Sequence, residues 1–62
     1  MNEFEILLNR KRAAAIESLK TLMNQIDAHK AKYSEVMDDK AMSELNASWD
    51  HIFNSLNKVK HV

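Results

Sequence analysis

The stretch from Met42 to Val59 repeats its large apolar residues at steps of three and four. These residues are Met42, Leu45, Trp49, Ile52, Leu56 and Val59. Residues with this spacing fall on one stripe of an α-helix, because the helix completes a turn every 3.6 residues. Such a stripe leaves water by packing against another helix. The stretch therefore predicts an amphipathic helix and requires a partner for it.

The composition of the chain excludes most other architectures. Gly and Pro are both absent, and the tight turns of β-hairpins need residues that tolerate positive φ. Cys is also absent, so disulfides and thiolate metal sites cannot hold the fold together. A chain of 62 residues buries only about 60% of its unfolded surface, which leaves a lone core marginal. We expect a single all-α domain over residues 1–62 that depends on self-association or on a partner protein.

A second apolar stripe runs along the N-terminal half of the chain. It comprises Phe4, Leu8, Ala15, Leu19, Leu22, Ile26, His29, Tyr33 and Val36. Asn2 precedes the stripe and is a favourable N-cap residue. No helix-breaking residue interrupts the stretch, so the first helix is predicted to span about residues 2–37.

The two stripes are out of phase, which indicates a turn between them. Continuing the first stripe beyond Val36 reaches polar residues, and the second stripe starts about a third of a turn away. Asp38 or Asp39 would cap a second helix, giving a turn at about 38–39 and a helix at about 40–60. A kink within residues 31–34 is the alternative.

Folding the chain back at this turn brings the stripes together as an antiparallel pair. The predicted layers are Val36 with Met42, Tyr33 with Leu45, His29 with Trp49, Ile26 with Ile52, Leu22 with Leu56, and Leu19 with Val59. All six layers join apolar or aromatic side chains, as expected of a helical hairpin. The predicted fold is therefore an all-α, two-helix antiparallel hairpin.

In this hairpin the segment from Met1 to Ala14 has no neighbour, although it carries several large apolar residues. Exposed clusters of this kind mark interfaces. Two-fold dimerisation into a four-helix bundle would cover the segment and the apolar residues flanking the stripes. The predicted interface residues are Phe4, Leu7, Leu8, Ile16, Met23 and Phe53. The alternative is a three-helix monomer in which the chain bends near residues 9–12.

Basic residues are expected to gather at the open end of the hairpin. They are Arg10, Lys11, Arg12, Lys58 and Lys60. Such a group can bind nucleic-acid phosphates or an acidic partner, although cations also simply suit a helix C-terminus and a solvated face. Nine basic and nine acidic residues give zero net charge, which argues against binding driven by overall charge. A dimeric RNA- or DNA-binding regulator is the alternative function.

No residue pattern predicts catalysis, cofactor binding or a metal site. The three histidines are scattered, and a two-helix unit offers little room for an active-site pocket. The longest apolar runs are too short for a membrane span or a signal-peptide core, so we expect a cytoplasmic protein. The predicted function is that of a small, homodimeric, non-enzymatic protein–protein interaction module, such as a regulator, adaptor or chaperone.

Overall fold

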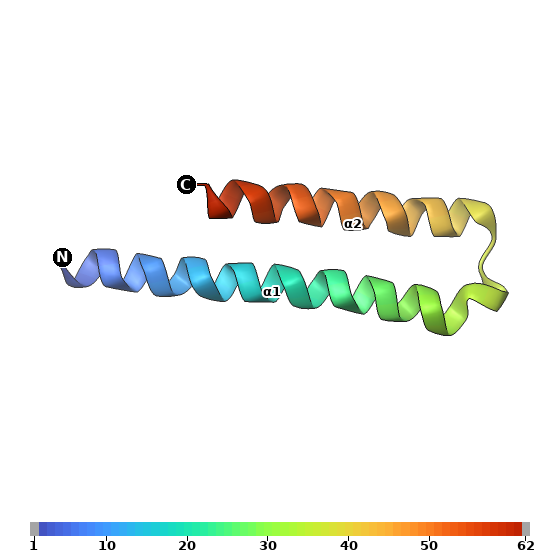
Figure 1. The fold of residues 1–62 in the computed structure, drawn as a ribbon, viewed down its shortest axis with the longest axis horizontal. Helices are drawn as coiled ribbons and strands as arrows, with labels where there is room; N and C mark the ends of the chain where they lie inside the picture. Colours follow the sequence, from blue (N-terminus) through green and yellow to red (C-terminus); the bar gives the residue numbers. More distant parts are fainter. Residues whose placement is uncertain (1, 62) are drawn as a thin grey trace.

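The computed structural model describes residues 2–61 and contains two long α-helices that lie antiparallel (Figure 1). Helix α1 spans Glu3–Tyr33, a single 3₁₀ turn (η1) spans Ser34–Val36, and helix α2 spans Asp39–Lys60. The Cα trace measures 52 × 17 × 10 Å, so the molecule is one layer deep. The predicted all-α hairpin is confirmed. Because α1 runs unbroken through residues 9–12, the bend required by the three-helix alternative is not found in the described residues.

Both helices begin at a side-chain cap that the sequence predicts. The Asn2 side chain accepts a hydrogen bond from the Glu5 backbone N–H at 2.8 Å, and Asp38 accepts one from the Ala41 N–H at 2.8 Å. Each bond satisfies one of the backbone donors left without a partner in the first turn of a helix. Of the two candidate aspartates, Asp38 is the cap and Asp39 is the first residue of α2.

The connection between the helices is longer than predicted. Helix α1 ends at Tyr33, four residues before the expected boundary, and η1 follows it. The Met37 N–H donates to the Ser34 carbonyl at 3.4 Å, and both Met37 and Asp38 have extended backbone. Positive φ angles are absent from the described non-glycine residues. A chain without Gly thus reverses by combining right-handed helical and extended residues, which takes more residues than a tight turn.

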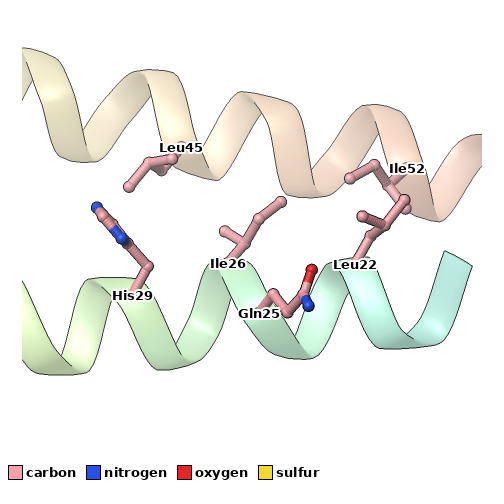
Figure 2. A pocket seen from close by; sticks show the side chains of 6 residues that line it. All are labelled: Leu22, Gln25, Ile26, His29, Leu45 and Ile52. Atoms are coloured by element: carbon pink, nitrogen blue, oxygen red, sulfur yellow. The ribbon is translucent and has the colours of Figure 1, made fainter.

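The longer connection changes the pairing of the two helices. Figure 2 shows His29 opposite Leu45, and Leu22 beside Ile52. The sequence-based layers paired His29 with Trp49 and Leu22 with Leu56, so those pairings are wrong by four residues, or about one helical turn. The reason is geometric: moving the midpoint of an antiparallel connection by two residues shifts the register by four.

Helix α1 is also rotated relative to the prediction. The half-buried residues of α1 recur at steps of four and three, and they are Arg12, Ile16, Leu19, Met23, Ile26 and Lys30. Four residues of the predicted core, namely Leu22, His29, Tyr33 and Val36, are exposed instead. Helix α1 carries apolar residues on two adjacent strips, and a single neighbouring helix covers only one of them. Among the described residues only Leu56, at 5% exposure, is fully buried.

Candidate interaction surface

The N-terminal part of α1 extends past the end of α2 (Figure 1). All side chains in residues 3–11, here called the overhang, are exposed, and the first half-buried residue is Arg12. Phe4 is 66% exposed and Leu7 is 50% exposed, and Leu8 is also exposed. Met1, which belongs to the segment predicted to lack a neighbour, lies outside the described residues. The overhang therefore presents apolar side chains to water.

The exposed apolar surface continues from the overhang along the rest of α1. Six exposed apolar or aromatic residues on one face of α1 are spaced at steps of 4, 7, 7, 7 and 4, and the polar residues Lys11, Ser18 and Gln25 lie between them. The six form the α1 stripe, which consists of Phe4, Leu8, Ala15, Leu22, His29 and Tyr33. Seven residues make nearly two full turns, so these positions share one face of the helix. Consistent with this, the rings of His29 and Tyr33 lie 4.8 Å apart, centroid to centroid.

Helix α2 widens the α1 stripe into a surface formed by two helices. A shallow groove of 240 Å³ lies between the helices and is lined by Leu22, Gln25, Ile26, His29, Leu45 and Ile52 (Figure 2). Its walls are mostly aliphatic, with one amide and one imidazole at the edge. The volume is below the range of about 300–1,000 Å³ that is usual for small-molecule sites. The groove is better suited to side chains from another helix.

The other side of the helix contact is more polar. A hollow there is lined by Lys20, Met23, Asn24, Asp27 and Trp49. The Trp49 ring stacks on Phe53, with centroids 5.4 Å apart and planes at 9°. Its buried Nε1 has no hydrogen-bond partner within residues 2–61. Of the flanking residues predicted for the interface, Phe53 is exposed, whereas Ile16 and Met23 are half-buried.

Lys30 joins the two helices by a polar contact. Its ammonium donates a hydrogen bond to Asn46 Oδ1 at 2.6 Å and lies 3.9 Å from Asp27 Oδ1. The side chain is only 23% exposed. Sequence reasoning missed this residue, since Lys30 was given no role in the predicted hairpin. The available signal was its position four residues after Ile26, on the strip that faces α2.

The predicted basic residues lie toward the open end of the hairpin, away from the connection (Figure 1). Arg10, Lys11, Lys58 and Lys60 are exposed. Arg12 is half-buried, and its Nη1 donates to Asn9 Oδ1 at 3.1 Å within the same helix. Four of the five basic groups thus present their charge to solvent, while the fifth is held against its own helix.

A third hollow, near the connection, brings polar groups of both helices together. It has a volume of 410 Å³, and its lining includes His29, Glu44 and Ser48. The Ser48 hydroxyl donates to the backbone carbonyl of Glu44 at 3.0 Å. That hydroxyl is therefore engaged with its own helix, and no hydrogen bond within residues 2–61 links it to His29. A nucleophile activated by an adjacent base would need such a bond.

No group of three His, Asp or Glu side chains among residues 2–61 could hold a metal ion. Neither helix, over the part of the chain that the structure describes, is both long and apolar enough to cross a membrane. Comparisons with protein-family models, with curated proteins and with solved structures gave no match.

Proposed function

We propose that this chain is a small, non-enzymatic protein–protein interaction module that associates with itself through an apolar helical surface. The observation that carries the proposal is the exposure of the overhang and the α1 stripe in the isolated hairpin. Phe4, Leu7, Leu8 and Leu22 are each more than 40% exposed. Contiguous apolar surface of this kind mainly serves binding in small proteins.

The total exposed surface gives a second, quantitative support. The hairpin exposes 5073 Å², whereas a compact monomer of 7.2 kDa exposes about 4,100 Å². The excess of roughly 950 Å² is close to the area of about 800 Å² that each partner contributes to a stable interface. This excess supports the proposal that the hairpin is one protomer of a larger assembly.

The sparse core points in the same direction. Only Leu56 is fully buried in the described residues, and the remaining residues between the helices are half-buried. Each square ångström of apolar surface removed from water stabilises a fold by about 25 cal/mol. Covering the exposed strip of α1 would therefore add stability that the hairpin alone does not have.

The proposal is tested by removing apolar groups from the overhang. We expect the double variant Leu7→Ser/Leu8→Ser to reduce self-association strongly, measured as solution mass by light scattering over a concentration series. The helix content should change little, because both side chains are exposed in the hairpin. Circular dichroism gives that second measurement.

A matched control is the double variant Ala13→Ser/Ala14→Ser. It also places two serines at consecutive exposed positions of α1, so it reproduces the loss of helix propensity without removing large apolar groups. It should associate like the parent. If the Leu7 and Leu8 variant keeps the oligomeric state of the parent, the overhang is not the interface.

A further inference from the structure

The spacing of the α1 stripe is the same when read from either end. The steps of 4, 7, 7, 7 and 4 residues run from Phe4 to Tyr33, with the midpoint between Ser18 and Leu19. A two-fold axis through that midpoint, perpendicular to the helix, superposes the stripe on itself. Self-complementarity of this kind is what an isologous interface requires, since the same patch serves both subunits.

We infer that the α1 stripe is the docking surface for α1 of a second copy, which runs antiparallel across it. The inference deepens the proposed function and rests on it. The two-fold axis places Phe4 against Tyr33 of the second copy, Leu8 against His29, and Ala15 against Leu22. Each exposed member of the stripe then meets another member.

The sizes of the paired residues suit this arrangement. On each side of the axis, the small Ala15 faces the large Leu22 of the second copy, which lets the helices approach each other there. Toward the ends, Phe4 and Tyr33 pair two aromatic rings. Alternation of small and large residues across an interface lets facing layers interdigitate.

The groove between the helices has a defined occupant in this dimer. It extends from Leu22 to His29 on α1 (Figure 2). Those two residues face Ala15 and Leu8 of the second copy, so the overhang of one protomer seats its Leu8 near the groove of the other. The two features that lack a neighbour within one chain, overhang and groove, thus cover each other.

The inference is tested by disulfide trapping with introduced cysteines. The chain has no Cys, so the single variants Ala15→Cys and Leu22→Cys each carry one thiol. A disulfide needs Cα atoms about 4.4–6.8 Å apart. Residue 15 meets residue 22 in the antiparallel dimer, whereas the two copies of residue 15 are offset by seven residues, or about 10 Å along the axis.

The two variants are mixed, reduced and then oxidised under mild conditions, and the products are separated by mass. Random pairing would give each homodisulfide half the abundance of the mixed disulfide. We expect the mixed 15–22 product to dominate and both homodisulfides to fall well below that proportion. Asn24→Cys, exposed on the polar side of α1, is the control and should not cross-link in a mixture with either variant.

Other outcomes overturn the inference in distinguishable ways. Abundant 15–15 and 22–22 disulfides would mean that the two helices run parallel. A dimer by light scattering with no cross-link at these positions would place the second copy on another face, which leaves the proposed self-association intact. A monomer that retains its helix content at every concentration would refute both the inference and the self-association.

Discussion

Leu56 lies in the contact between the helices, four residues before the end of α2, and its burial distinguishes it from every other described residue. It belongs to the apolar stripe that the sequence predicts between Met42 and Val59, and its neighbours in that stripe, Ile52 and Val59, are half-buried. Leu22 provides the contrast: it has the same side chain and was placed in the predicted core, but it is 44% exposed. Substitutions at these two residues should therefore differ in their effect on the stability of the hairpin.

Leu56→Ala should lower the free energy of unfolding by about 2–5 kcal/mol, because it removes a buried side chain and leaves a cavity. Leu22→Ala should cost only about 1 kcal/mol in the dissociated hairpin, since much of its surface is already in water. Urea denaturation followed by circular dichroism, at low protein concentration, measures both values. Equal losses in the two variants would contradict the rotation of α1 described above.

Lys30 and Asn46 make the polar link between the helices. Asn46→Ala should destabilise the hairpin by about 1 kcal/mol, because a half-buried ammonium would lose its hydrogen-bond acceptor. Asn54→Ala is the control, as Asn54 is exposed on the same helix. Thermal unfolding of the two variants gives the comparison, and indistinguishable melting curves would show that the link carries no net stability.

At the scale of helices, the features set by short-range residue patterns agree with the sequence-based predictions, whereas the features set by long-range geometry do not. The caps at Asn2 and Asp38, the two helices and their antiparallel order could be predicted, since each depends on short-range residue patterns. The register and the rotation of α1 could not. The register depends on the length of the connection, and a connection without Gly gives no clear sequence signal of its length. The rotation depends on which of the two adjacent apolar strips of α1 faces α2.

The N-terminal cap at Asp38 leads to a prediction about the stability of helix α2. Asp38→Ala should destabilise α2 by about 1 kcal/mol, because the Ala41 N–H loses its acceptor. Asp39→Ala is the matched control, since Asp39 is a neighbouring acidic residue that does not cap the helix. Loss of helix content on heating reports the difference. If Asp39→Ala costs as much as Asp38→Ala, the effect is charge near the helix N-terminus and not capping.

For the whole molecule, the sequence predicts an uncovered N-terminal segment, because α2 is the shorter helix. The apolar residues exposed along the rest of α1 were assigned to the core instead, so the full extent of the candidate surface emerges only from the structure. The flat, one-layer shape explains why: a hairpin buries one face of each helix, and the remaining apolar residues need a second layer.

A chain that folds and associates together should melt at a temperature that depends on its concentration. With an unfolding enthalpy of about 0.7 kcal/mol per residue, a dimer of this length should gain roughly 5 °C in Tm for each tenfold rise in concentration. Circular dichroism melts at three or more concentrations measure the slope. A constant Tm would mean that association adds nothing to the stability of the hairpin.

The chain contains one tryptophan and one tyrosine, and the fold assigns them to different surfaces. The Trp49 indole N–H is buried beside the helix contact, whereas Tyr33 is exposed on the α1 stripe. Natural fluorescence can therefore follow two events without an added label. Dilution of the antiparallel dimer should alter the tyrosine signal while tryptophan emission holds steady, and urea should then shift the tryptophan emission as the helices separate.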